Sequence, residues 1–369
     1  MKHIGKSYDK VDAKGILSGK PSYTGDFVPK GALIIKVLRS PHAQARIKSI
    51  DTSKAKLIPG VEAVFTYEDV PNTRFTLAGQ TYPEPSAYDA LILDPVVRYV
   101  GDEVALVVAK DEATALKAMP LIKVEYEVQK PVLDLRTAMD HETVVHPEDD
   151  ILNHIPVGQD YKRNICVSYH KRVGDIEAEL AKCDYVVEGT YFDQATRQSA
   201  MEPFQSFGYI DHLGRIVIVS STQIVFHVRR HIARALGIPA SKIRVIKPRI
   251  GGGFGSKQTA CTELMTAFVT WKLQKPCYLL YDRTEAQTCS TTRHAREWYI
   301  RVGATKDGII QVIDMDSITD AGAHATHCFT TTTAGEHKSV PLYNKAKAVH
   351  YGTEGVYMNH TPGGAFRGY

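Results

Sequence analysis

The sequence predicts an α+β fold built from two successive parts, and three observations support this. Short runs rich in Val, Ile and Tyr recur between polar turns, as strands do. Two stretches, 111–120 and 224–239, carry the start and stop signals of helices. Residues 131–165 are richer in Pro, His, Asp and Asn and lack periodicity, which indicates a linker between the parts.

The first part, residues 1–130, begins with strands expected over 32–40 and 61–70, the second of which enters a turn. The run DEVALVVAK (102–110) is a further strand, and its continuous apolar centre predicts burial on both faces. A helix follows, with Asp111 as its N-cap and Pro120 at its end, and then another strand.

The second part, residues 166–369, alternates strands with two helices. The helix over 224–239 is expected to stop at Gly237 and Pro239, and a second helix over 261–273 has apolar residues at helical spacing. Asp307-Gly308 predicts the turn of a hairpin over 298–316. The other expected strands cover 183–194, 207–223 (two strands with a turn at Leu213-Gly214) and 242–250.

Composition excludes several classes of protein. The chain has 369 residues, 43% hydrophobic and 23% charged, which is typical of globular domains in water. Its net charge of +4, without a long Lys/Arg run, does not indicate a nucleic-acid surface. No apolar stretch approaches the roughly 20 residues that span a bilayer, and the N-terminus has no apolar signal core. We therefore expect a cytoplasmic protein without nucleic-acid or membrane partners.

The six cysteines form no C-x-x-C pair, and their spacing fits neither a zinc site nor an iron–sulfur cluster. We expect most of them to be reduced and buried. His227 and His231 are four residues apart on a predicted helix, but two arginines lie between them, so a solvated helix face is expected. For the group His324, His327 and Cys328, a loop near a cofactor entrance or a structural role is expected rather than a metal site.

The stretch RIGGGFGSKQ (249–258) places four glycines between a strand and a helix. Glycine loops in this position often bind phosphate. The P-loop pattern fails because Ser256 separates Gly255 from Lys257, and the dinucleotide pattern fails because its third glycine is Ser256. A tight turn against a neighbouring segment is the alternative. Phe254 favours a wall beside a flat or bulky ligand.

Three further segments combine with this loop: SSTQ (220–223), MEPFQSFGYID (201–211) and GGAFRGY (363–369). Together they resemble the molybdenum-binding subunit of the xanthine dehydrogenase and aldehyde oxidase family, in particular its bacterial xanthine dehydrogenases. Residues 39–70 are similar to that family's N-terminal α/β hammerhead domain. The resemblance implies a hammerhead domain at 1–130 and, at 166–369, the first half of a mixed α/β molybdopterin-binding domain.

The resemblance assigns a cofactor site residue by residue. Gln223 matches the glutamine that hydrogen-bonds a molybdenum oxygen, and Gly253, Phe254 and Gly255 match the loop whose backbone lines the metal site. Arg367 matches the arginine beside the cofactor. The implied cofactor is molybdenum–molybdopterin, as the mononucleotide or the cytosine dinucleotide, with no protein side chain ligating the metal directly.

The substrate side of the site is implied at Gln258 and Tyr369, and here the sequence departs from the family. Animal xanthine-oxidising relatives have a glutamate at the position of Gln258. Purine-oxidising relatives have an arginine upstream of the position of Arg367, whereas this chain has none between Arg301 and Arg367. Both departures disfavour xanthine itself. The carbon monoxide dehydrogenase branch is disfavoured because Gly-Ala, without cysteine, precedes FR.

The implied activity is the hydroxylation of an N-heterocycle or aldehyde with water as the oxygen source. Family members are longer, so the catalytic glutamate base is expected beyond Tyr369, and none is expected in this chain. The implied partners are the C-terminal half of the subunit, an iron–sulfur subunit and an FAD subunit. Glu202 is expected to be structural or near the substrate channel. The alternatives are an inactive remnant or structural half of a split subunit, and a phosphate- or nucleotide-binding enzyme.

Overall fold

A seven-stranded mixed sheet joins strands from both predicted parts of the chain. The computed structural model describes residues 2–368, and the strand order in this sheet is β11-β10-β9-β12-β1-β5-β3. The parallel pairing of β1 with β12 ties the first third of the chain to the later strands. The strands are β1 (Leu33–Arg39), β3 (Val61–Phe65), β5 (Glu103–Ala109), β9 (Gln205–Ile210), β10 (Ile216–Ser220), β11 (Ile243–Ile246) and β12 (Cys277–Leu280).

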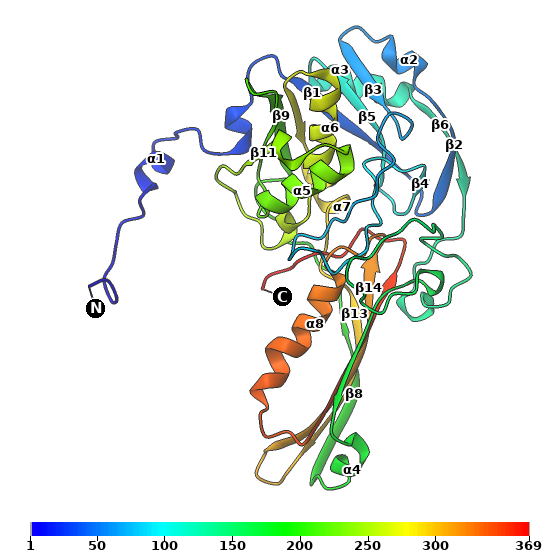
Figure 1. The fold of residues 1–369 in the computed structure, drawn as a ribbon, viewed down its shortest axis with the longest axis vertical. Coiled ribbons are helices and arrows are strands. Elements are labelled where there is room, and N and C mark those ends of the chain that lie inside the picture. The colour runs from blue at the N-terminus through cyan, green and yellow to red at the C-terminus, as the bar shows by residue number, and fades with distance from the viewer. Residues whose placement is uncertain (1, 369) are drawn as a thin grey trace.

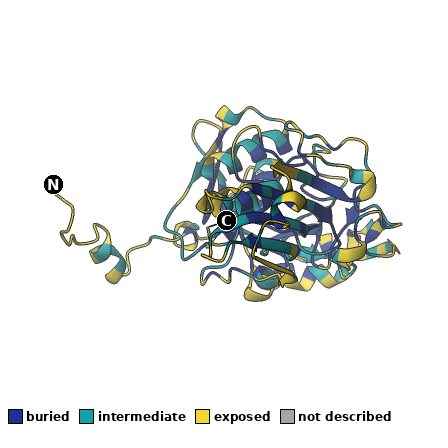
Figure 2. Ribbon diagram, turned by 90° about the horizontal axis from the view of Figure 1, so that it is seen from below, coloured by how far each residue is buried: buried dark blue, intermediate teal, exposed yellow. Residues whose placement is uncertain are grey.

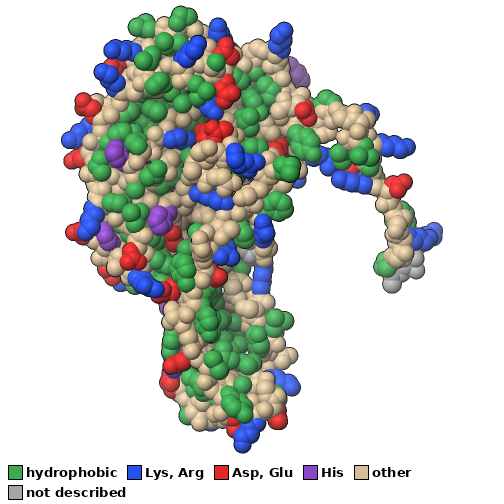
Figure 3. All heavy atoms as spheres, turned by 180° about the vertical axis from the view of Figure 1, so that it is seen from behind, with side chains coloured by type: hydrophobic (Ala, Val, Ile, Leu, Met, Phe, Trp, Pro, Cys, Tyr) green, Lys and Arg blue, Asp and Glu red, His purple; other side chains and the backbone are tan. Residues whose placement is uncertain are grey.

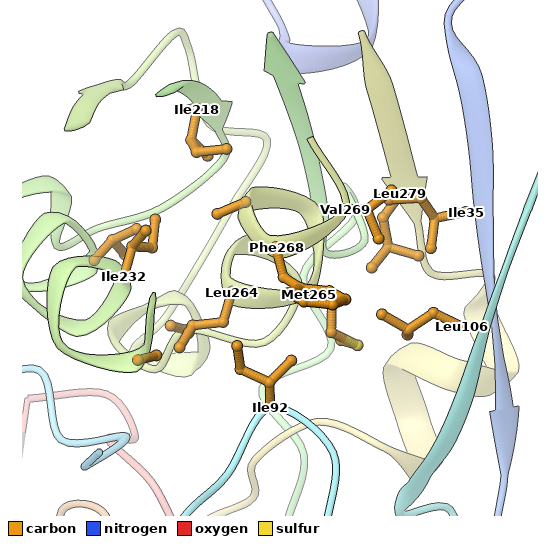
Figure 4. Packing of buried hydrophobic residues seen from close by; sticks show 14 of the residues in the cluster. Ile35, Ile92, Leu106, Ile218, Ile232, Leu264, Met265, Phe268, Val269 and Leu279 are labelled. Atoms are coloured by element: carbon orange, nitrogen blue, oxygen red, sulfur yellow. The ribbon is translucent and has the colours of Figure 1, made fainter. Parts of the chain in front are cut away.

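Two helices, α5 (Val225–Leu236) and α6 (Glu263–Leu273), pack against this sheet and form the main core. The α6 helix is buried on nearly all sides, and Phe268 at its centre is fully buried among aliphatic side chains from the sheet (Figure 4). Burial of a side chain of this size stabilises the fold by about 1.5–3 kcal/mol. Gly237 ends α5 in a left-handed conformation with φ of 65°, as predicted.

The first part adds a three-stranded sheet of order β4-β2-β6 and two short helices. The Asp111 side chain accepts a hydrogen bond from the backbone of Thr114 at 2.8 Å, which confirms the predicted N-cap. A 3-10 turn containing Pro120 ends that helix, also as predicted. The elements are β2 (Ala45–Asp51), β4 (Val96–Val97), β6 (Lys123–Val128), α2 (Ser53–Lys56) and α3 (Glu112–Ala118).

An elongated lobe extends from the main body and is built on a five-stranded sheet of order β7-β15-β14-β13-β8 (Figure 1). The predicted hairpin is confirmed as β13 and β14, with Gly308 at positive φ in its turn. The elements are β7 (Ile165–Val173), β8 (Tyr185–Asp193), β13 (Arg296–Ala304), β14 (Ile310–Gly322), β15 (Ala348–Tyr357), α4 (Ile176–Leu180) and α8 (Cys328–Ser339).

Residues 131–165 are irregular, apart from 3-10 turns at Leu135–Thr137 and Tyr161–Arg163. The segment is nevertheless packed, because Val132 and Val145 are fully buried in a second core with residues of β14 and β15. It is therefore a buried connection rather than a solvated tether. Domain boundaries at 130 and 166 stay a prediction.

Residues 2–21, with α1 (Ala13–Leu17), project from the body and are mostly exposed (Figures 1 and 2). The last short helix, α7 (Arg283–Thr288), carries a capping box at Asp282. Among residues 2–368, no helix is long and apolar enough to cross a membrane. All six cysteines are free and four are buried, which agrees with the expectation from their spacing.

Candidate cofactor site

The glycine loop connects β11 to α6 through a chain of left-handed residues. Gly252 and Gly255 have φ of 103° and 101°, and Phe254 between them has φ of 53°. A 3-10 turn, Ser256–Gln258, follows, and α6 begins only at Glu263. The loop is therefore separated from the N-terminus of α6, where a phosphate-binding loop would place its ligand.

Lys257 is turned into the protein and is 2% exposed. Its Nζ lies 2.8 Å from Oε2 of Glu202, which also accepts a hydrogen bond from the backbone of Gly251 at 2.6 Å. Burial lowers the pKa of Lys257, and the hydrogen bond to Glu202 acts in the opposite direction. This lysine has no access to a bound phosphate, which counts against the nucleotide alternative. The predicted structural role of Glu202 agrees with these contacts.

Gln223 follows β10 and meets the glycine loop directly. Its Oε1 accepts a hydrogen bond from the backbone of Gly255 at 3.2 Å, and its own backbone nitrogen donates to the carbonyl of Lys257 at 2.8 Å. A Cβ at Gly253 would lie 2.6 Å from Oε1, so only glycine allows this approach. No residue in the range 2–368 accepts a hydrogen bond from the Gln223 side-chain nitrogen, which remains available as a donor.

The C-terminal segment closes onto the same loop. The backbone nitrogen of Arg367 donates to the carbonyl of Phe254 at 2.9 Å, and the Arg367 guanidinium carbon lies 5.6 Å from the centre of the Phe254 ring. A Cβ at Gly255 would lie 2.5 Å from the carbonyl oxygen of Ala365, so the two backbones are in contact. Gln198 holds that carbonyl with a hydrogen bond of 2.6 Å.

The two glycines before Ala365 explain how this segment is positioned. A Cβ at Gly363 would lie 2.3 Å from the His294 ring, and a Cβ at Gly364 would lie 2.7 Å from Thr291. The backbone of Gly364 also donates to the carbonyl of Thr292 at 2.8 Å. Close packing on these residues therefore carries the chain to Arg367 beside the glycine loop.

The structure thus brings together all the predicted cofactor residues: Gln223, Gly253, Phe254, Gly255 and Arg367. Gln258 lies at the end of the loop, where its carbonyl is so close to Gly79 that a Cβ there would approach to 2.1 Å. Tyr369 lies outside the described residues.

Three neighbouring residues complete the description: His327, for which a structural role or a loop near a cofactor entrance was expected, Gln198, which carried no sequence signal, and His231. His327 is 1% exposed, and its Nε2 accepts a hydrogen bond from the backbone of Gly79 at 3.0 Å. Gln198 lies in an irregular stretch whose contacts only the tertiary fold defines. His231 corrects the prediction of a solvated helix face, because this side of α5 faces the core and His231 is 3% exposed, with Nε2 3.8 Å from Glu84.

The side chains of Gln223, Phe254 and Arg367 face outward, and together with the loop they form a surface rich in hydrogen-bond donors. Gln223 and Arg367 are exposed, and Phe254 is 51% exposed. Within residues 2–368 no carboxylate pairs with the Arg367 guanidinium, so its five N–H donors are available. Amide and guanidinium donors beside an aromatic wall fit a flat anionic cofactor, and the set contains no Cys or His that would ligate a metal.

The fold is that of the molybdopterin-binding class of proteins. Residues 157–369 match the molybdopterin cofactor-binding domain, and residues 18–130 match the a/b hammerhead domain of aldehyde oxidase and xanthine dehydrogenase. The chain belongs to the xanthine dehydrogenase and aldehyde oxidase family, which confirms the resemblance seen in the sequence.

Known proteins similar to the chain include the probable hypoxanthine oxidase XdhD of Escherichia coli K12, with 38% identity over 99% of this chain and 41% of that protein. The nicotinate dehydrogenase large molybdopterin subunit of Eubacterium barkeri is 31% identical, and the match covers 99% of this chain and 81% of that subunit. The aldehyde oxidoreductase structure from Desulfovibrio gigas superposes with a TM-score of 0.87 at 26% identity, over 99% of this chain and 40% of its own. The chain thus spans under half the length of the first and third of these proteins.

Proposed function

We propose that this chain binds a molybdenum–molybdopterin cofactor and forms part of an oxidoreductase that hydroxylates an N-heterocycle or an aldehyde with water as the oxygen source. The observation that carries the proposal is the convergence of Gln223, the Phe254–Gly255 backbone and Arg367 at one exposed surface with uncommitted donors. When bound, the cofactor would supply the redox-active metal and the oxygen-transfer chemistry.

Each residue of this surface has a distinct part in the proposal. The side-chain nitrogen of Gln223 donates a hydrogen bond, because its oxygen is already held by Gly255. Arg367 supplies a permanent positive charge to an anionic group. Phe254 forms an apolar wall, and the substrate-binding role is assigned to Gln258 and Tyr369.

The substrate class follows from the relatives and from one side chain. Hypoxanthine and nicotinate, named in two of the relatives, are nitrogen heterocycles, and a third relative is named for aldehydes. Gln258 offers a neutral amide that both donates and accepts hydrogen bonds, and this suits an uncharged heterocycle. A missing arginine between Arg301 and Arg367 disfavours xanthine itself.

The partner proposal is supported by apolar surface on the lobe. Strand β8 forms the edge of the five-stranded sheet, and Tyr185, Val187 and Tyr191, which share one of its faces, are 60%, 64% and 53% exposed. Figure 3 shows hydrophobic side chains gathered on this lobe. Contiguous apolar surface of this kind marks an interaction site. We assign it to the C-terminal half of the molybdenum subunit, with iron–sulfur and FAD subunits completing a cytoplasmic complex.

The direct test is metal and pterin analysis of the chain purified in association with its partner polypeptides. We expect molybdenum and a fluorescent oxidised pterin in equal amounts, and released CMP would identify the dinucleotide form. An intact complex that contains neither molybdenum nor pterin would refute the proposal and favour the inactive-remnant alternative.

A further inference from the structure

Three buried side chains from separate regions of the chain converge at a position that the proposed cofactor site does not use. Asp89 lies between β3 and β4, His146 lies in the connection 131–165, and His324 follows β14. They are 0%, 1% and 9% exposed. One possible ligand atom from each lies within 4.8 Å of the others.

The ring of His146 is oriented by the backbone. Its Nε2 lies 2.7 Å from the carbonyl oxygen of Ala323. A carbonyl can only accept a hydrogen bond, so Nε2 carries the proton and Nδ1 keeps its lone pair. A ring nitrogen bonded to a backbone carbonyl in this way is the usual arrangement for a histidine whose other nitrogen binds a metal.

Asp89 is oriented in the same manner. Its Oδ2 accepts hydrogen bonds from the Tyr357 hydroxyl at 2.9 Å and from the backbone of Ala325 at 2.8 Å. These two donors satisfy one oxygen and direct the other, Oδ1, toward His324, whose Nδ1 lies 3.3 Å away. The carboxylate is therefore held with one oxygen facing the two histidines.

The atoms that face one another have no hydrogen bonds among residues 2–368. This holds for Asp89 Oδ1, His146 Nδ1 and His324 Nδ1, all of which are inaccessible to solvent. Each buried polar atom left without a hydrogen bond costs about 1–3 kcal/mol. The lone pair of His146 Nδ1 and the Asp89 carboxylate oxygen are both acceptors, so a cation bound between them and His324 would satisfy all three atoms.

We propose that Asp89, His146 and His324 bind one divalent transition-metal ion, with zinc as the expected ion. Two imidazole nitrogens and one carboxylate oxygen are typical zinc ligands, whereas calcium and magnesium prefer oxygen alone. Zinc bonds of about 2.0–2.1 Å in tetrahedral geometry place neighbouring ligand atoms roughly 3.3 Å apart. The Asp89–His324 separation of 3.3 Å already has this value.

The surroundings supply the remaining requirements of such a site. His324 borders a cavity of about 80 Å³, which has room for the water that would complete the coordination. The nearby guanidinium of Arg98 pairs with Asp94 at 2.9 Å, which balances its charge, and also with a second carboxylate, Glu148. Glu148 Oε2 lies 3.4 Å from His146 Nδ1 and adds negative charge beside the metal.

The bound ion would tie together three segments, of which strand pairing joins the first two nearby, through the β-bridge between Tyr88 and Leu152. Asp89, the connection 131–165 and the turn before α8 would become one cross-linked unit. This role is structural, and it is independent of molybdenum, because Gln223 and Arg367 take no part in it.

A second group on the lobe, His170, Asp316 and His350, provides a matched control. It is partly exposed, and one ring nitrogen of each histidine is already engaged: His170 Nε2 with Glu354 at 2.8 Å and His350 Nδ1 with Asp314 at 2.8 Å. Weak surface binding of a metal would depend on this second group.

The test uses the full 369-residue chain, produced in zinc-supplemented medium and passed through a chelating column. We expect one zinc per chain, and after removal of zinc, Co²⁺ should restore one equivalent with visible d–d absorption bands. H146Q and H324Q should lose at least about tenfold in Co²⁺ affinity, whereas H350Q should bind as the wild type does.

The wild-type chain gives a second readout if H146Q or H324Q fails to fold. A chelator should lower its melting temperature, and added zinc should restore it. Absence of zinc together with absence of cobalt bands would overturn the proposal and indicate a buried Asp89–His324 ion pair. Zinc retained by both H146Q and H324Q, or lost only in H350Q, would overturn it as well.

Discussion

Lys257 Nζ lies 2.8 Å from Glu202 Oε2, and the same carboxylate oxygen accepts the backbone N–H of Gly251 at 2.6 Å. One oxygen atom therefore holds both ends of the glycine loop. The lysine side chain is 1% exposed and the glutamate side chain 9% exposed, so water screens this pair very little. The loop is thus fixed in shape by the protein itself, which preorganises its backbone for a ligand.

Substitution of this carboxylate should destabilise the fold. E202Q leaves a buried lysine without a counter-charge, and we expect the free energy of unfolding to fall by about 3 kcal/mol in urea denaturation. E62Q is the matched control, because Glu62 pairs with Lys275 at 2.7 Å on the surface, and it should cost at most about 1 kcal/mol. Equal effects of the two substitutions would contradict the role assigned to Glu202.

The contact between Gly255 and Ala365 predicts a second difference between matched variants. G255A would place a Cβ 2.5 Å from the Ala365 carbonyl at φ of 101°, whereas G308A has a similar backbone, φ of 76°, but open space. We expect G308A to cost about 1 kcal/mol from backbone strain alone and G255A to cost more.

Limited proteolysis of these two variants gives an independent measurement. G255A should expose the C-terminal segment to cleavage, because the steric clash separates it from the glycine loop. G308A should leave cleavage of that segment unchanged. If the C-terminal segment of G255A resisted cleavage as well as that of the wild type, its position would not depend on the contact between Gly255 and Ala365.

Much of the fold could be predicted because its signals are local. The apolar run of β5, the cap at Asp111 and the turn at Gly308 are each encoded within a few residues, and the structure confirms them. The insertion of β12 between β9 and β1 and the parallel pairing of β15 with β14 were not predicted. Those pairings join distant segments, and no local pattern specifies a strand's partner.

In the candidate site as well, residues in local sequence motifs could be predicted, and contacts between distant segments could not. Gln223, the glycine loop and Arg367 could be assigned to one site from the sequence, because each lies in a motif that carries the resemblance to the family. The Lys257–Glu202 pair and the Asp89–His146–His324 group could not be found from spacing, because their members lie far apart in the chain. The prediction of a solvated face for His227 and His231 on α5 was wrong for a related reason. Their spacing places them on one side of the helix but does not indicate whether that side is buried.

Removal of Arg367 should reduce cofactor content without reducing stability. The side chain is exposed and its guanidinium lies over the Phe254 and Phe366 rings, so R367A should unfold within about 0.5 kcal/mol of the wild type. We expect the molybdenum content of the partner-associated chain to fall at least tenfold, since one charge-assisted hydrogen bond contributes about 1.5–3 kcal/mol. R244A, on an exposed position of β11, should keep its molybdenum. Equal metal content in R367A and R244A would remove Arg367 from the proposed site.

Two buried histidines predict how stability depends on pH. Burial lowers the pKa of both His294 and His327 to about 3, and the positive charge of Arg296 acts in the same direction on His294. In the unfolded chain a histidine titrates near pH 6.5, so below that pH the unfolded state binds more protons. The free energy of unfolding should therefore fall as pH decreases from about 6.5 toward 3, by up to about 1.4 kcal/mol per pH unit for each histidine.

Urea denaturation between pH 7.5 and 5 measures the slope of the free energy of unfolding against pH. Most carboxylates titrate at roughly pH 4, below this range. H294Q should remove one histidine's share of the slope, because glutamine takes up no proton on unfolding, even if its packing against Gly363 changes the overall stability. H212Q, at an exposed turn position, should leave the slope as it is in the wild type. A slope in H294Q equal to that of H212Q would mean that His294 takes up no proton on unfolding, and the loss of stability in acid would then have to arise from other groups.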